Sequence, residues 1–152
     1  MRFLPVLFLL LLSMASAAPQ AIPPPTDDYS GMYTFLRDGE FIQLTVEEEG
    51  QVTGFISRFG DSDADKNEFL DQFFERGKLE AGHLTFATKN VHGSWFTFGG
   101  TVGRGTAKKP EDEGYYMIRG TLVRFQSDPD KKNTTQQSRR VEFKSFPRDV
   151  TP

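Results

Sequence analysis

Short runs of alternating apolar and polar residues return along most of this chain, and this period of two constrains the fold more than any other feature. The clearest example is the stretch 83–102, in which two such runs flank a short break at 90–93. This stretch also contains Trp95, the single tryptophan. Two alternating runs joined by a short turn predict a β-hairpin. The alternation therefore indicates a chain built of antiparallel strands.

About eight strands are predicted, at spacings of about 10–14 residues and with no helical repeat between them. Their ranges are 32–36, 40–47, 51–58, 72–79, 83–89, 94–103, 113–125 and 139–146. The dipeptide Asp38-Gly39 predicts a type I′ turn between the first two strands. The segments 104–112 and 126–137 are predicted to be loops.

Residues 59–71 interrupt the alternation with a polar loop. The phenylalanines that follow are spaced to suit a helix that continues to Arg76. In a second interpretation, one short helix or helical turn lies near residues 63–71 and a strand begins at Gln72. We favour the second, because Leu79, Ala81-Gly82 and Leu84 have the pattern of a strand, a turn and a strand.

These elements predict an all-β fold, an antiparallel up-and-down β-barrel of about eight strands. A β-sandwich is the alternative. Closure of the sheet removes the two edges whose unpaired backbone groups would promote aggregation. A barrel of eight strands has an interior that side chains fill or that holds one small ligand. Glycines within the strands could provide the necessary bends, and they are Gly54, Gly99, Gly100 and Gly120.

The N-terminus has the pattern of a secretory signal peptide over residues 1–17. One positive charge precedes an apolar run, and Ala15-Ser16-Ala17 fits the cleavage rule, so we expect cleavage after Ala17 and a secreted or periplasmic protein. The rest divides into a proline-rich linker at 18–29, the barrel domain at 30–147 and a C-terminal tail at 148–152.

Composition excludes several classes of function. The chain contains no cysteine, so we expect no disulfide, no thiol catalysis and no zinc–thiolate site. Its formal net charge of −3 argues against a nucleic-acid partner, which requires a basic face. Apart from the signal peptide there is no long hydrophobic segment, so we expect no membrane association after its cleavage. The 15 phenylalanines supply the apolar surface that a core without disulfides requires.

Several short motifs resemble the avidin-like barrels, within the wider calycin group that includes the lipocalins. The first is Gly31-Met-Tyr, followed by Phe41-Ile and by Gly50-Gln-Val-Thr-Gly54. The second is Phe86-Ala-Thr-Lys89, followed by a strand that ends in Thr-Phe-Gly-Gly-Thr. The resemblance covers about half of the mature chain and implies an eight-stranded barrel.

The residues with which avidins bind biotin are not retained. Avidins surround biotin with several tryptophans, whereas this chain has one, and Thr88 stands where the tryptophan next to the lysine is expected. Phe35 takes the place of an asparagine, and Ile56 and Arg58 take the places of a tyrosine and a serine. The resemblance therefore implies architecture and not biotin binding.

A ligand site in the barrel would combine aromatic walls with a few polar groups. The candidates are Tyr33, Phe35, Trp95 and Tyr115, with Arg58 and Arg119 to neutralise an anionic ligand if they face inward. The alternative is that the aromatic residues simply fill the barrel.

Asp61, Asp63 and Asp65 have the alternating spacing of a calcium loop. However, Lys66 stands where such a loop needs glycine and Gln72 where it needs a bidentate glutamate, and a solvated acidic loop is the alternative. No other cofactor is expected. Asn133-Thr-Thr is a glycosylation sequon in a eukaryote, and the sequence does not decide whether Asn133 is modified.

These features favour a secreted, non-enzymatic binding or interaction module that binds a small hydrophobic or anionic ligand in the barrel, or a protein partner. One alternative is a barrel enzyme of the isomerase or cyclase type, with Glu75, Glu113 or His83 as its acid or base. Another is a structural or envelope-associated protein that acts through its outer surface. The sequence contains no catalytic motif and leaves the oligomeric state open.

Overall fold

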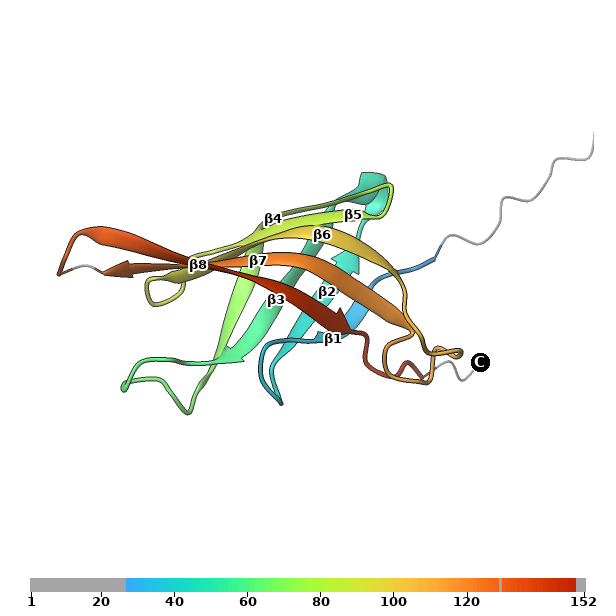
Figure 1. Ribbon diagram of the computed structural model, residues 1–152, viewed down its shortest axis with the longest axis horizontal. Coiled ribbons are helices and arrows are strands. Elements are labelled where there is room, and N and C mark those ends of the chain that lie inside the picture. Colours follow the sequence, from blue (N-terminus) through green and yellow to red (C-terminus); the bar gives the residue numbers. More distant parts are fainter. Residues whose placement is uncertain (1–26, 129, 150–152) are drawn as a thin grey trace, which may run out of the picture.

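The computed structural model describes residues 27–128 and 130–149, which form a single curled antiparallel sheet of eight strands (Figure 1). The only helical element in this part of the chain is a short 3-10 turn, η1, at Glu48–Gly50. The strands are β1 (Gly31–Thr34), β2 (Phe41–Val46), β3 (Val52–Phe59), β4 (Phe69–Glu80), β5 (His83–Thr88), β6 (Ser94–Arg104), β7 (Tyr116–Asp128) and β8 (Asn133–Lys144).

Each strand pairs with the next along the chain, so the spatial order is β1 to β8. The two outer strands approach each other at one end of the sheet, where Tyr33 bridges to Ser145. There the Phe146 amide donates to the Met32 carbonyl over 2.8 Å, and the Lys144 amide donates to Thr34 Oγ1 over 2.9 Å. The predicted up-and-down topology is confirmed, and the alternative of two packed sheets is not found.

Alternation along the strands places most of their buried apolar side chains inside the curl, as the period of two requires. Aromatic rings then form a continuous series of contacts through the interior, from Phe74 to Phe86, Phe98, Phe143, Phe35 and Phe96. The rings of Phe74 and Phe86 stack 4.4 Å apart. The depth of the barrel is therefore filled with side chains.

A pair of glycines allows β6 and β7 to approach closely. Gly100 lies opposite Gly120, and the ring of Phe98 covers both. A Cβ on Gly100 would meet the carbonyl oxygen of Arg119 and the Cα of Gly120. Gly99, in contrast, has no heavy atom within 4 Å of the place where its Cβ would lie. Of these neighbouring glycines, Gly100 is needed for packing and Gly99 is not.

We expect Gly100→Ala to lower the free energy of unfolding by about 1–3 kcal/mol, because the added methyl group overpacks the backbone of β7. Gly99→Ala is the matched control and should change stability by less than about 0.5 kcal/mol in the destabilising direction. Urea unfolding followed by circular dichroism measures both. Equal effects of the two substitutions would contradict the role given to Gly100.

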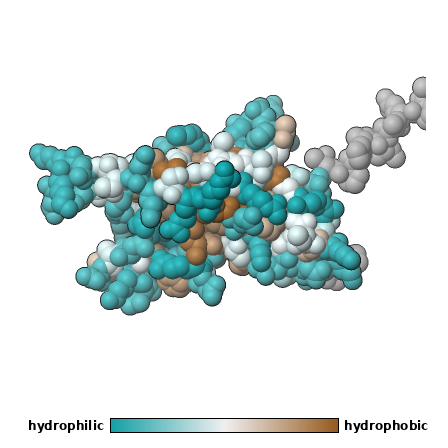
Figure 2. Space-filling model, viewed as in Figure 1, coloured by the Kyte–Doolittle hydropathy of each residue, from teal (hydrophilic) through white to brown (hydrophobic). Residues whose placement is uncertain are grey.

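The prediction of a loop at 126–137 is wrong. Strands β7 and β8 continue through most of it and form a hairpin that projects beyond the other strands, at the left of Figure 1. The first eight residues of β8, 133–140, are exposed. The tip is hydrophilic (Figure 2), and with solvent on both faces these strands have no apolar alternation to reveal them.

The segment before β4 also differs from the prediction. Residues 63–67 form turns, closed by bonds from the Asp65 amide to the Ser62 carbonyl and from the Glu68 amide to the Asp65 carbonyl. The predicted helical turn is therefore present as turns alone, and β4 already begins at Phe69, three residues before the expected start. At Asp38-Gly39 only the glycine has a positive φ, so the turn is not type I′.

The predicted signal peptide, residues 1–17, and most of the linker lie outside the described residues. At the edges of the described chain, Tyr29 packs against the core, and the guanidinium of Arg148 donates to the carbonyls of Asp28 and Ser30. The two ends of the domain are therefore tied together. No helix in the described ranges is long and apolar enough to cross a membrane.

Candidate functional site

One end of the curled sheet, here called the mouth, collects the loops 35–40, 60–68 and 89–93 together with the start of the β7–β8 hairpin. This end of the interior is polar, whereas the rest contains aromatic and aliphatic side chains. Polar side chains gather there from six strands or loops, some of them buried and some exposed, and they are Arg37, Glu40, Arg58, Asp61, Asp65, Gln72, Ser94 and Arg124.

Arg58, on β3, is the central charged group of the mouth. Alternation along β3 turns it inward with Ile56, and its side chain is only 4% exposed. Its guanidinium lies over the ring of Phe96, 5.6 Å from the ring centre. Burial lowers the pKa of Arg58, and the Asp61 carboxylate opposes that shift. A guanidinium remains charged in either case, so the mouth contains a fixed, buried positive charge.

Gln72, on β4, holds Arg58 in position. It is fully buried, and its Oε1 accepts from Arg58 Nε over 2.5 Å. Its Nε2 donates to the carbonyls of Ser94 and Lys89 over 2.8 and 3.2 Å. These three hydrogen bonds fix the Gln72 amide in position. The orientation of the Arg58 guanidinium is therefore set by a group that is itself held in place.

Three arginines contact the carboxylate of Asp61. Arg58 Nη1 and Arg124 Nη2 donate to Asp61 Oδ2 over 2.6 and 2.8 Å, and Arg37 Nη2 reaches Oδ1 over 3.4 Å. Arg124 also donates to Ser94 Oγ over 3.3 Å. Arg37, Arg58 and Arg124 are here called the arginine cluster. Such convergence of guanidinium groups is the arrangement that recognises carboxylates and phosphates in proteins.

The arginine cluster lies between two adjoining hollows. One has a volume of about 160 Å³ and a polar lining that includes Ser94 and His92. The other has a volume of about 150 Å³ and is lined on one side by Phe35 and Phe96. Arg58, Asp61 and Arg124 line both. The site therefore places positive charge beside an aromatic wall.

A second carboxylate, that of Asp65, fixes the loop 60–68. The Nδ1–H of His92 donates to Asp65 Oδ2 over 2.8 Å, and Ser62 donates to Oδ1 from its amide and its hydroxyl. The hydrogen bond from His92, followed by that from Ser62, lowers the pKa of Asp65 to about 2. The loop that carries Asp61 is thus tied to the loop 89–93.

We expect this tie to weaken in acid. Because the folded pKa of Asp65 lies below its ordinary value of 3.8, its contribution to stability is present above about pH 4 and is lost as the pH falls towards 2. The stability difference between the wild type and Asp65→Asn should therefore shrink between pH 5 and pH 2. Urea unfolding across this range measures it, and a difference that does not change with pH would contradict the assignment.

The structure brings together two of the six predicted ligand-binding residues. Phe35 and Arg58 meet at the mouth, beside Phe96. Tyr33 is fully buried in the core, and its hydroxyl donates to the Tyr29 carbonyl.

The other three predicted ligand-binding residues lie away from the mouth. Trp95 faces outward and stacks on Phe125, with their ring centres 5.2 Å apart. Arg119 faces outward and pairs with Glu142. Tyr115 lies after the loop at the opposite end, where Arg104 covers its ring.

The three aspartates of the predicted calcium loop do not converge. Asp61 contacts the arginine cluster, Asp63 is exposed and Asp65 contacts His92 and Ser62. Across the described ranges, no group of three or more acidic, histidine or cysteine side chains is placed to hold a metal ion. The acid or base candidates for an enzyme, Glu75, His83 and Glu113, are all exposed and do not line the interior.

Sequence reasoning missed Gln72, Arg124 and the ion-pairing role of Asp61. Arg124 lies two residues after the buried Leu122 on β7, so the alternation predicts that its side chain faces inward. The sequence predicts Gln72 as the first residue of its strand, whereas β4 begins at Phe69 and Gln72 lies within it. Which loop carboxylate meets the arginines depends on the tertiary fold and has no local signal.

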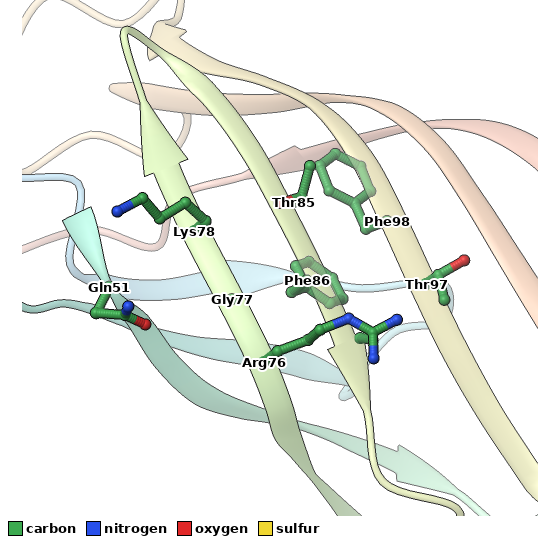
Figure 3. A pocket seen from close by; sticks show the side chains of 9 residues that line it. Gln51, Arg76, Gly77, Lys78, Thr85, Phe86, Thr97 and Phe98 are labelled. Atoms are coloured by element: carbon green, nitrogen blue, oxygen red, sulfur yellow. The ribbon is translucent and has the colours of Figure 1, made fainter.

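A larger hollow of about 390 Å³ lies on the outer side of β4, β5 and β6 (Figure 3). Arg76 extends across β5 towards Thr97, while Lys78 points away. Arg76 is 73% exposed, and its contact with Glu75 is 3.8 Å long. An exposed, flexible arginine loses conformational freedom when it contacts a ligand. The hydrogen bonds of Arg58 already restrict the conformation of its side chain. The mouth is therefore the better-organised site despite its smaller volume.

No protein-family model matches the chain, and no curated protein matches its sequence. Among solved structures, a rhizavidin–biotin complex aligns with a TM-score of 0.57 and 11% identity, over 77% of this chain and 99% of that chain. The fold is avidin-like. A bradavidin2–biotin complex (TM-score 0.51, 13% identity) covers 76% of this chain and 95% of its own. Apo bradavidin2 aligns with a TM-score of 0.50 and 12% identity, over 76% of this chain and 95% of its own.

The resemblance to avidin-like barrels that the sequence predicts is confirmed at the level of the fold. Identities of 11–13% carry no residue of a binding site from those proteins to this one.

Proposed function

We propose that this protein is a non-enzymatic binding module that takes a small anionic molecule at the mouth of its avidin-like barrel. The observation that carries the proposal is the buried guanidinium of Arg58, held by Gln72 beside an aromatic wall. Two structural neighbours are biotin complexes, which supports a small molecule as the type of ligand. Because phenylalanine side chains fill the depth of the barrel, we place the ligand at its open end.

The chemistry of the mouth favours an anion with an apolar part. Guanidinium groups bind carboxylates through paired, charge-assisted hydrogen bonds. Phe35 and Phe96 would contact the apolar part, since both border the hollow of about 150 Å³. A preorganised site loses little conformational entropy when the ligand binds, and the hydrogen bonds of Arg58 and Arg124 to neighbouring groups supply that preorganisation.

Benzoate is a suitable probe, with the neutral benzamide as its control. We expect benzoate to bind to the wild type, benzamide to bind much more weakly, and Arg124→Gln to reduce the affinity for benzoate by about tenfold or more. Arg140→Gln, an exposed substitution of the same type on β8, should leave the affinity unchanged. Isothermal titration calorimetry measures the binding of benzoate and of benzamide to the wild type, and the binding of benzoate to the two variants. Equal binding of benzoate and benzamide, or no effect of Arg124→Gln, would refute the proposal.

We also propose that the protein is exported. The support is the signal-peptide pattern of residues 1–17, and the absence of cysteine allows the fold to form without disulfides in an oxidising compartment. Expression of the full chain followed by mass spectrometry of the exported fraction should find Ala18 as the new N-terminus. Retention of the full-length chain inside the cell would contradict it.

A further inference from the structure

The carboxylate of Asp61 lies where the arginine cluster would bind a ligand. We propose that Asp61 is an internal substitute for a ligand carboxylate, and that a carboxylic acid with an apolar body displaces it from Arg58 and Arg124. This inference rests on the proposed function and adds the chemical class of the ligand and the step that opens the site.

The arginines and the carboxylate are held in place differently. Arg58 and Arg124 lie on β3 and β7 and keep other partners, namely Gln72, the Phe59 carbonyl and Ser94. Asp61 lies in the loop 60–68, and its side chain is 36% exposed. If Asp61 moved away, the arginines would stay in position, because the sheet and not the loop holds them. The positive site therefore exists independently of the carboxylate that occupies it.

The space at the mouth consists of two small hollows. The two hollows at the mouth measure about 160 and 150 Å³, and each is smaller than the ~300 Å³ at the lower end of ordinary ligand pockets. Asp61 lines both of them. Movement of its carboxylate away from Arg58 and Arg124, which line both hollows too, would enlarge the space that a ligand can enter. The side chain that occupies the positive site thus also takes up space at the border of both hollows.

The side chains on either side of the arginines would contact the rest of the ligand. A carboxylate bound to Arg58 and Arg124 would have the side chains of Phe96 and Phe35 on one side. Their rings meet edge to face, with centres 5.6 Å apart, and form an apolar wall. On the other side lie Ser94, Gln126 and His92, which offer polar contacts. An aromatic or branched aliphatic carboxylic acid fits this combination better than a phosphate, which has no apolar part.

Competition by Asp61 has a measurable consequence. Only the fraction of molecules in which the loop carboxylate has left the arginines can bind, and the apparent affinity is reduced by that fraction. Asp61→Asn keeps the size of the side chain but removes its charge, so it weakens the competitor and leaves the arginines in place. We expect Asp61→Asn to bind benzoate about tenfold to a hundredfold more tightly than the wild type.

The experiment is a calorimetric titration of benzoate into the wild type, Asp61→Asn and Asp63→Asn. Asp63 lies two residues away in the same loop, is exposed and makes the matched control for the loss of one negative charge. Asp61→Ser is a second variant, and thermal unfolding shows which of the variants are folded. Asp63→Asn should bind benzoate as the wild type does, while the folded Asp61 variants should bind it more tightly.

The outcomes separate this inference from the proposed function. Tighter binding by the Asp61 variants but not by Asp63→Asn supports both. Binding by the wild type that depends on Arg124, with no gain in the Asp61 variants, overturns the inference and leaves the proposed function standing. No benzoate binding by the wild type or by any Asp61 variant overturns both.

Discussion

Replacement of Phe96 by alanine should lower the free energy of unfolding by about 3–5 kcal/mol, the usual cost of removing a buried phenylalanine. Phe96 is 1% exposed and contacts the ring of Phe35 on one side and the guanidinium of Arg58 on the other. The cavity left by the substitution would lie directly beneath the arginine cluster. Affinity for an anionic ligand should therefore fall together with stability.

The control is Phe73→Ala, the same substitution on the outer face of β4, where the side chain is 54% exposed. Because solvent already reaches this ring, its loss should cost less than about 1 kcal/mol. Urea unfolding gives both values. A cost for Phe96→Ala no greater than that for Phe73→Ala would contradict the position of Phe96 in the core.

Gln72→Leu should destabilise the fold by about 2–4 kcal/mol, although leucine has a similar size. The substitution removes the acceptor of Arg58 Nε and the donor to the carbonyls of Ser94 and Lys89. The buried Arg58 Nε then has no acceptor, and an unsatisfied buried group costs about 1–3 kcal/mol, whereas the Ser94 carbonyl keeps its hydrogen bond from the Val91 amide. Arg58 would also lose its fixed orientation, so affinity for benzoate should fall in the folded variant.

Gln136→Leu on β8 is the matched control, since Gln136 is exposed and lies opposite Phe125 on the outer face, away from the arginine cluster. Its stability should stay within about 0.5 kcal/mol of the wild type. If Gln72→Leu were as stable as this control, Gln72 would not be the group that orders the arginine cluster.

The fold was predictable because the signal for it is local. Alternation of the type Ile42, Leu44, Val46 along β2 places side chains inside the curl without knowledge of any other strand. The same pattern predicts β3, β5 and β6 nearly to their ends. The hairpin of β7 and β8 is the exception, because its outer half has no apolar face and depends on the pairing of two polar strands.

The site was only partly predictable. Phe35 and Arg58 could be named from composition and alternation, but their convergence with Arg124 and Asp61 depends on the tertiary fold, since Asp61 and Arg124 alone are 63 positions apart in the sequence. Trp95, the rarest residue, was expected to line the ligand site, and instead it stacks on Phe125 on the outer face. A rare residue indicates a ligand site only when the alternation of its strand directs it inward.

The most direct test of the arginine cluster as a carboxylate site is a titration of the wild type with benzoate, followed through the arginine Nε–H signals in proton–nitrogen correlation spectra. The proposal predicts that the signals of Arg58 and Arg124 shift along one saturation curve, while that of the exposed Arg140 does not move. Saturable binding of benzoate that shifts Arg76 in the outer hollow and leaves Arg58 and Arg124 unchanged would contradict it.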